Sequence, residues 1–500
     1  MFFVVLLAGL SCGALGRLLL RDADTGWHIR NGQLVLANHA ITRVDAFSST
    51  MAGKTWYAWE WLYDLLIGAI HLVFGLNGVV FYSAAIIAAA FVLALHVCLR
   101  RGANLPVALF LLIVALGASA VHFLARPHVV SWLFAVIWFD VLDSAAENSR
   151  DHLFWLPALM VLWVNLHGGF VLGFLLVGVY LVAGGIDYYF HREKRVEILA
   201  WLMRLGTVTG LCALASLVNP YTYHLHVHVV RYLSDRFLMD RISEFLSPDF
   251  HAVAQQCFAV LLLLTVVALA SARGRPMTAR LLVVLLAAYT GFYATRNLPT
   301  SSLLICIVIA PVFSESIRAA GSDSRIAPWL RGFFSWLDGF GERMGKMEFE
   351  FRGHLWIVVA FVLGLWACAN RGRIGSEQVI HAYFDEKKFP VAAVNAIAER
   401  GIHEPIFTLD YWGGYVIYRL YPQNKVVVDD RHDLYGDQFF KDYLKIVWAQ
   451  EGWDKTLADM HVNCILAPTD STLAGILRIT PAWKMTYDDD VGEVFQKEER

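Results

Sequence analysis

The sequence predicts a multi-pass α-helical membrane protein that ends in a small α/β domain. Of its 500 residues, 57% are hydrophobic and only 17% are charged, whereas soluble domains carry roughly 25% charged residues. Apolar runs recur over residues 1–373, and several approach the length of about 20 residues that crosses a bilayer. Residues 374–500 instead alternate short apolar strands with amphipathic helices. The net charge of −2 gives no reason to expect a nucleic-acid partner.

The chain begins with the apolar run Met1–Leu20. This run lacks the basic region and the clear cleavage site of a signal peptide, so we expect a retained membrane helix. A polar stretch follows, with an amphipathic segment at 27–37. The next apolar stretch, 59–74, is short and charged, which favours a helix at the membrane interface over a span. We therefore expect residues 21–76 to form the first external loop, with juxtamembrane helices.

Ten later apolar runs predict ten further spans. They cover approximately residues 77–99, 105–123, 129–142, 153–166, 170–189, 200–217, 253–270, 281–294, 303–313 and 355–368. With eleven spans in total, the most basic loops, including the predicted cytoplasmic loop 315–353, share a side with the N-terminus. The positive-inside rule then places the N-terminus in the cytoplasm and the C-terminal domain outside. If residues 59–74 formed a span, every later loop would lie on the opposite side of the membrane, against the positive-inside rule.

This topology places several polar clusters together on the outer face. They are Asp22, Asp24 and His28 after the first span, then Arg126 and His128, Asn165 and His167, and Arg296 and Asn297. Taken singly, each has an ordinary explanation, because a histidine can be a satisfied structural partner and an arginine can extend its charge from a span to the interface. Their convergence on one face favours a functional site.

These residue types suit the transfer of a group from a lipid phosphate. A partly desolvated carboxylate can act as a general base toward a hydroxyl or an amine. Arginine offers a planar, permanently charged fork for phosphate, and His or Asn can donate further hydrogen bonds to an anion. Asp22 and Asp24 could instead hold a divalent cation such as Mg²⁺ or Mn²⁺, although two carboxylates alone do not establish a metal site.

Several stretches resemble one family of enzymes. The acidic pair after the first span is followed by TRVDAFSSTMAGKTWYAWEWLYDLL, and later stretches read ARPHVVSWLF, NLHGGFVLG, LVNPY, TRNLP and, in the tail, DYWGGYVIYRLYPQNKVVVDDRHDLYGDQF. Over nearly the whole chain, the sequence is similar to bacterial membrane glycosyltransferases of the C-type (GT-C) superfamily. Their relatives are the polyprenyl- and dolichyl-phosphate-mannose protein mannosyltransferases and the lipid A aminoarabinose transferases.

The resemblance implies a sugar donor linked to polyprenyl phosphate and an acceptor at the outer face of the bacterial cytoplasmic membrane. It places the general base of an inverting displacement on Asp24, with Asp22 as the second acidic residue. Glu60 is a candidate contact for the acceptor. Thr25 stands where the mannosyltransferases have Glu, so the resemblance does not indicate which sugar or which acceptor this protein uses. The candidates for binding the donor and its phosphate rest on placement alone: His28, Arg126, His128, Asn165, His167, Arg296 and Asn297.

The domain expected over residues 374–500 is a small α/β layer with a partly parallel sheet. Its predicted strands are 405–409, 425–429 and 462–466, and its predicted helices are 390–400, 436–449 and 454–461. Asp429, Asp430, Arg431 and Asp433 follow the second strand, where open α/β sheets bind ligands. For these four residues we favour a structural cluster of ion pairs.

Three other functions stay open. An oligosaccharyltransferase or glycan ligase that uses a diphosphate-lipid donor is chemically close. A lipid or polysaccharide transporter would also have many spans, but internal repeats and charges at the midplane would be expected. The third is a non-catalytic assembly factor that uses its outer domain for protein contacts.

Overall fold

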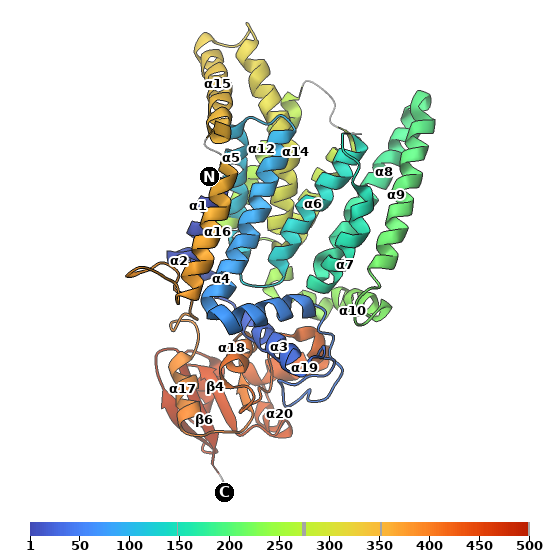
Figure 1. Cartoon of the computed structure of the whole chain (residues 1–500). Coiled ribbons are helices and arrows are strands. Elements are labelled where there is room, and N and C mark those ends of the chain that lie inside the picture. Colours follow the sequence, from blue (N-terminus) through green and yellow to red (C-terminus); the bar gives the residue numbers. More distant parts are fainter. Residues whose placement is uncertain (148, 273–276, 351–352, 499–500) are drawn as a thin grey trace.

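The computed structural model describes residues 1–147, 149–272, 277–350 and 353–498. It is a bundle of long helices with the C-terminal domain at one end and, at the other, the hairpin of α14 (Leu298–Ser322) and α15 (Pro328–Glu350) (Figure 1). In the described residues, seven helices are long and apolar enough to cross a membrane, and four shorter apolar helices accompany them. Each predicted span overlaps one of these eleven helices, so the multi-pass helical fold is confirmed.

The helical part has a simple order along the chain. Its longer elements are α1 (Phe2–Ser11), α2 (Gly13–Leu18), α3 (Asp24–Asn38), α4 (Trp61–Arg100), α5 (Leu105–Ser119), α6 (His128–Ala146), α7 (Leu156–Leu166), α8 (Val171–Phe190), α9 (Arg195–Ala215), α10 (Tyr223–Ser234), α11 (Arg236–Met239), α12 (Val253–Ser271), α13 (Thr278–Tyr293), α14 (Leu298–Ser322), α15 (Pro328–Glu350) and α16 (Gly353–Ala369). The predicted loop 315–353 is thus largely helical, and its residues 351 and 352 lie outside the described residues.

The first predicted span is not one continuous helix. The helix breaks between α1 and α2, where Cys12 is extended (φ −110°, ψ 153°) and Gly13 has φ +65°. A positive φ suits glycine, which lacks a Cβ. The prediction of a single helix over Met1–Leu20 was therefore wrong in detail, because one glycine conformation interrupts an apolar run that hydropathy reads as uniform.

The interfacial helix and the second span are joined in α4. Non-helical angles at Gly75 (φ 60°, ψ −157°) mark a kink that separates residues 61–74 from the following span. The first segment packs on α3, the two backbones meeting where Gly32 and Gly68 oppose each other. The sequence-based separation of 59–74 from 77–99 thus corresponds to a real change of direction.

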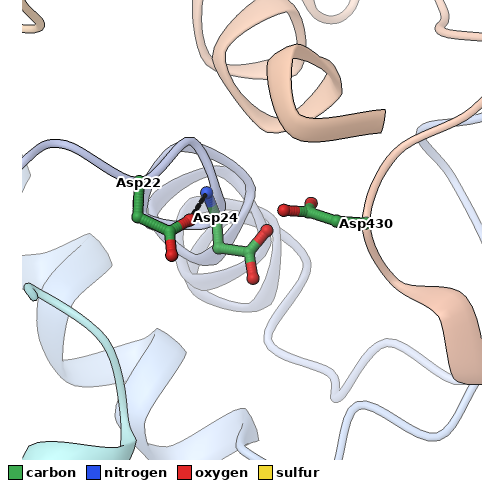
Figure 2. Close-up of side chains that lie close together, drawn as sticks. All are labelled: Asp22, Asp24 and Asp430. Carbon is green, nitrogen blue, oxygen red and sulfur yellow. Dashed lines mark hydrogen bonds between the residues drawn. The ribbon is translucent and has the colours of Figure 1, made fainter. Parts of the chain in front are cut away.

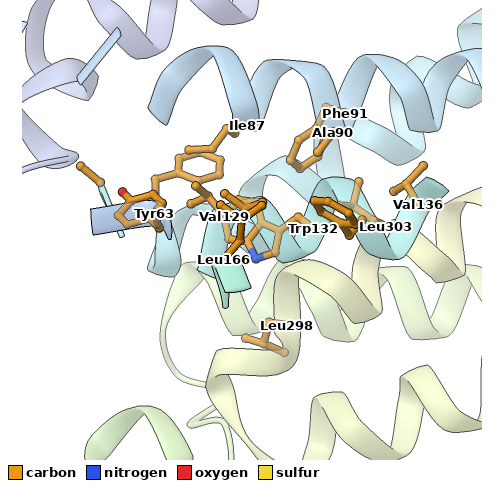
Figure 3. Packing of buried hydrophobic residues seen from close by; sticks show 14 of the residues in the cluster. Tyr63, Ile87, Ala90, Phe91, Val129, Trp132, Val136, Leu166, Leu298 and Leu303 are labelled. Atoms are coloured by element: carbon orange, nitrogen blue, oxygen red, sulfur yellow. The ribbon is translucent and has the colours of Figure 1, made fainter. Parts of the chain in front are cut away.

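Large aromatic side chains fill the centre of the bundle. Tyr63, Phe91, Trp132, Trp138 and Trp163 are all fully buried, and Figure 3 shows how several of them pack with aliphatic side chains from other helices. The apolar windows of α4 and α6 are 67% and 72% buried, against 17% for the α9 window. The bundle is therefore built around α4 and α6, with α9 at its periphery.

The C-terminal domain contains a four-stranded sheet in the order β3-β4-β6-β5. β3 and β4 are parallel, whereas β6 is antiparallel to both of its neighbours. The elements of this domain and of the short hairpin before it are β1 (Arg373–Ile374), β2 (Glu377–Gln378), α17 (Val391–Glu399), β3 (Ile406–Thr408), α18 (Asp410–Leu420), α19 (His432–Val447), α20 (Trp453–Asp459), β4 (Cys464–Pro468), α21 (Thr472–Leu477), β5 (Trp483–Asp488) and β6 (Gly492–Lys497). The partly parallel α/β layer is confirmed.

Two details of this domain differ from prediction. The expected strand 425–429 makes only isolated parallel bridges from Val426, one to Ile406 and one to Ser48 of the first loop. Helix α18 was not predicted, because two adjacent glycines lower helix propensity. Those glycines allow a close approach: a Cβ on Gly414 would lie 2.4 Å from the Ala23 carbonyl oxygen. The C-terminal domain is therefore docked directly on the first loop.

Candidate active site

Three carboxylates from distant parts of the chain meet where α3 begins. Asp22 and Asp24 come from the first loop, and Asp430 comes from the segment just before α19 (Figure 2). One oxygen from each lies within 4.8 Å of the others. The backbone N–H of Asp24 donates to Asp22 Oδ1 at 2.9 Å, and the N-terminus of α3 favours a negative charge at Asp24.

Arg126 holds the first two carboxylates together. Its Nη1 lies 2.9 Å from Asp22 Oδ2, and its Nη2 lies 2.6 Å from Asp24 Oδ2. The backbone beside Arg126 is fixed because the Thr25 hydroxyl donates to the Ala125 carbonyl oxygen at 3.1 Å. Arg126 thus bridges the two carboxylates, with one charge-assisted contact to each.

Asp24 is held in its ionised form. Burial opposes ionisation, but the Arg126 guanidinium, with hydrogen bonds from Asp430 and from Trp27 Nε1, outweighs it and lowers the pKa of Asp24. Asp430 behaves in the opposite way, since burial and the Asp24 carboxylate raise its pKa well above the ordinary value. A protonated Asp430 can therefore donate to an ionised Asp24.

The three carboxylates are also a suitable set of ligands for a metal ion. Carboxylate oxygens are the ligands that Mg²⁺ and Mn²⁺ prefer. Asp430 Oδ1 is buried and has no hydrogen-bond partner within the described ranges, so one oxygen of the set has unused capacity. The set exceeds the two residues expected from sequence, because the C-terminal domain supplies the third.

A cavity opens beside this cluster. Its charged lining residues combine carboxylates with three arginines, and its aromatic ones come mainly from the first loop: Asp24, Glu60, Asp64, Arg126, Glu244, Arg296, Asp430, Arg431 and Asp433, with Trp27, Trp56, Tyr57, Trp59 and Tyr232. Arg296 pairs with Glu244 at 3.2 Å and lies over the Phe245 ring. The cavity thus offers cationic groups for an anion next to an ionised carboxylate.

Comparisons with known proteins identify the fold. Neither a scan against protein-family models nor a search of curated proteins finds a match. The archaeal oligosaccharyltransferase AglB from Archaeoglobus fulgidus, solved with an inhibitory peptide and a dolichol-phosphate, aligns with a TM-score of 0.60 at 10% identity, over 94% of this chain and 69% of AglB. ArnT from Cupriavidus metallidurans in the apo state aligns with a TM-score of 0.51 at 13% identity, over 99% of this chain and 97% of ArnT. Both are GT-C membrane glycosyltransferases. The chain has the GT-C fold.

On this GT-C fold, four of the residues predicted from sequence line the cavity together. They are Asp24, Glu60, Arg126 and Arg296, and Asp22 adjoins them through Arg126. His28 and His167 lie behind Glu60, at 3.7 Å and 3.5 Å from its two carboxylate oxygens. Their roles stay predictions, but their convergence places them at one site.

Three predicted donor-binding residues are instead engaged in the GT-C scaffold. Asn165 accepts a hydrogen bond from Trp61 Nε1 at 2.7 Å and donates to two backbone carbonyls. Asn297 donates to the Thr290 carbonyl at 3.0 Å. His128 donates through Nε2 to the His122 carbonyl at 2.9 Å. Within the described residues, none of the three lines the cavity beside Asp24.

Sequence reasoning did not identify Asp430 or Glu244 as part of this candidate site. The expectation of a structural ion-pair cluster describes the residues on either side of Asp430, since Arg431 pairs with Asp429 at 2.7 Å. Asp430 itself turns the other way, toward Asp24 (Figure 2). The available signal was a third acidic residue at the C-terminal end of a predicted strand, where ligand sites are common.

Proposed function

We propose that the protein transfers a sugar from a polyprenyl-phosphate-linked donor to an acceptor at the outer face of the bacterial cytoplasmic membrane. The observation that carries this proposal is the pairing, in one cavity, of a carboxylate held ionised with arginines suited to a phosphate. The similarity of fold to AglB and ArnT supports the same reaction class. The N-terminus would then be cytoplasmic and the C-terminal domain extracytoplasmic.

In the proposed reaction, a hydroxyl or amine of the acceptor attacks the anomeric carbon of the donor. Asp24 takes the proton of the acceptor as the general base. The bond between the anomeric carbon and the phosphate oxygen breaks, and Arg126 and Arg296 hold the phosphate by charge-assisted hydrogen bonds. A single displacement inverts the anomeric configuration.

A divalent cation would be held by Asp22, Asp24 and Asp430. When bound, such an ion supplies positive charge that stabilises the developing phosphate anion. Arg126 already neutralises part of the carboxylate charge, so the ion would complement this residue. We therefore include Mg²⁺ or Mn²⁺ as a proposed cofactor.

An oligosaccharyltransferase with a diphosphate-lipid donor is the second candidate. The observation in its favour is that AglB is an oligosaccharyltransferase and aligns with a higher TM-score than ArnT. The cavity chemistry suits both donors, because each leaves a lipid-linked phosphate anion. A transporter is less well supported, since the charged groups that line the cavity lie together at one end of the helix bundle.

The test is a profile of glycans and lipid-linked sugars in host cells that carry wild type, a deletion or Asp24→Asn. This substitution preserves size and removes the base. Asp459→Asn, an exposed position on α20, is the matched control and should behave as wild type. We expect the deletion and Asp24→Asn to lose one glycan and to accumulate one lipid-linked sugar, whose phosphate content separates the two candidate donors. A wild-type profile for Asp24→Asn would exclude Asp24 as the base.

A further inference from the structure

Glu60 is a buried carboxyl group on the wall of the cavity, and its pKa is raised whereas that of Asp24 is lowered. It lies at the N-terminal end of α4, and its side chain is only 13% exposed. It lines the cavity that also contains Arg126 and Arg296. Its pairings with protein side chains are loose, because the closest are to His167 Nε2 at 3.5 Å and His28 Nε2 at 3.7 Å. Its carboxyl group is therefore available to a ligand in the cavity.

One oxygen of Glu60 faces an Asp–His pair. His28 Nδ1 lies 2.6 Å from Asp64 Oδ1, and the other Asp64 oxygen accepts from Asn31 Nδ2 at 2.6 Å. Because Asp64 is an acceptor, Nδ1 of His28 donates to it. His28 Nε2 is buried, has no hydrogen-bond partner within the described ranges, and lies 3.7 Å from Glu60 Oε2.

The other oxygen faces a second histidine of known tautomer. His167 Nδ1 accepts from the Gly169 N–H at 3.0 Å and is 2.7 Å from the Ser131 hydroxyl, which in turn accepts from Trp163 Nε1. Nδ1 is therefore the acceptor of the neutral ring, so the proton sits on Nε2. That N–H lies 3.5 Å from Glu60 Oε1. His167 thus directs an N–H toward one oxygen of Glu60, and His28 Nε2 lies beside the other.

The surroundings explain why this proton is retained near neutral pH. Burial is the main cause that raises the pKa of Glu60 to about 7, and Asp64 adds to it, while His28, Arg126 and Arg296 act to lower it. The charged and titratable groups that face Glu60 come from every element packed around it: His28, Asp64, Arg126, His167 and Arg296. Asp24, in the same cavity, has its pKa lowered by Arg126. Two carboxyls whose pKa values are pushed apart around one site are the usual arrangement for an acid and a base.

We propose that Glu60 is the general acid of the reaction and gives its proton to the departing lipid phosphate. This inference rests on the proposed function. His28 and His167 are positioning residues that flank its carboxyl group. Asp24 would act on the acceptor, and Glu60 would act on the leaving group.

The proposed step balances in atoms and charge. The acceptor oxygen or nitrogen forms a bond to the anomeric carbon, and its proton passes to Asp24. The bond between the anomeric carbon and the phosphate oxygen breaks, and its electron pair stays on the phosphate. The Glu60 proton moves to that phosphate oxygen, so the lipid leaves as a monoanion. Glu60 then recovers a proton from water as Asp24 releases one.

The test is the binding of undecaprenyl phosphate, a lipid-phosphate product, to the full-length protein in detergent. Binding is followed by tryptophan fluorescence, because Trp56 and Trp59 line the cavity. If protonated Glu60 binds the phosphate, affinity falls about tenfold between pH 6 and pH 8, as the protonated fraction falls through a pKa near 7. Glu60→Gln, which stays neutral and keeps a donor, should bind with little such loss. Glu399→Gln, exposed on α17, should match wild type.

A second measurement needs no variant. Calorimetry of wild type at pH 8 in two buffers with different ionisation enthalpies should show the uptake of close to one proton per bound lipid. Equal pH profiles for wild type and Glu60→Gln, or no proton uptake, would overturn the role of Glu60 while leaving the lipid-phosphate site intact. Failure of undecaprenyl phosphate to bind any form at any pH would instead overturn the proposed function.

Discussion

The sharpest structural prediction concerns Arg431, which joins the C-terminal domain to the first loop. Its side chain is 2% exposed, with Nη1 at 2.8 Å from Asp45 Oδ1 and Nη2 at 2.7 Å from Asp429 Oδ2. The guanidinium also lies over the Trp56 ring, 4.6 Å from its centre. Arg431→Met keeps much of the apolar stem but leaves two buried carboxylates without their cation. Removing one partner of a buried ion pair costs about 3–5 kcal/mol.

The expected effect is large enough to measure by thermal unfolding in detergent. At roughly 2–4 °C per kcal/mol, Tm should fall by about 6–20 °C. Lys441→Met removes an exposed pair with Asp437 and should change stability by less than about 1 kcal/mol. Changing Asp45 and Asp429 to Asn in the Arg431→Met background should restore part of the loss, because the stranded charges are gone. The reasoning from buried charge is wrong if the Tm of Arg431→Met lies within 2 °C of the Tm of Lys441→Met, a difference of about 1 kcal/mol or less.

Two further predictions follow from the same region. Gly414→Ala should destabilise the protein by about 1–3 kcal/mol and reduce activity, since its Cβ would lie 2.4 Å from the Ala23 carbonyl oxygen. The control is Gly475→Ala, at an exposed position of α21 with open space around it, which should be neutral or slightly stabilising in the same thermal assay. Asp430→Asn should weaken Mn²⁺ binding by at least tenfold. The variant should then show a smaller rise in Tm than wild type when Mn²⁺ is added. An equal rise in wild type and variant would show that Asp430 does not bind the metal.

The helical architecture could be predicted because its signal is local. The length of an apolar run and the charges at its ends decide whether a segment spans the bilayer, and both are read directly from the sequence. The separation of 59–74 from the next span succeeded for the same reason, since Glu60 and Asp64 mark the interfacial part. The break at Cys12 and Gly13 was missed because hydropathy carries no information on backbone angles.

The site was predictable only in part because its members are distant in sequence. Asp22, Asp24, Arg126 and Arg296 could be grouped by topology, since each follows or precedes a span on one face. Asp430 could not, because nothing local distinguishes it from its neighbours Asp429 and Arg431, which are structural. Its role depends on how the C-terminal domain docks, and that docking depends on contacts at α18 that helix propensity disfavours.

The docking contacts imply that the C-terminal domain is part of the site and not an appended binding module. The Val426 backbone bonds to the first loop on both sides, accepting from the Ser49 N–H at 2.8 Å and donating to the Phe47 carbonyl at 3.1 Å. Gly414 of α18 approaches the start of α3, and Arg431 closes the same interface. Any shift of this domain would move Asp430 relative to Asp24. Because the proposed glycosyl transfer needs its charged groups placed within fractions of an ångström, we expect changes at this interface to alter that activity even where the membrane helices remain folded.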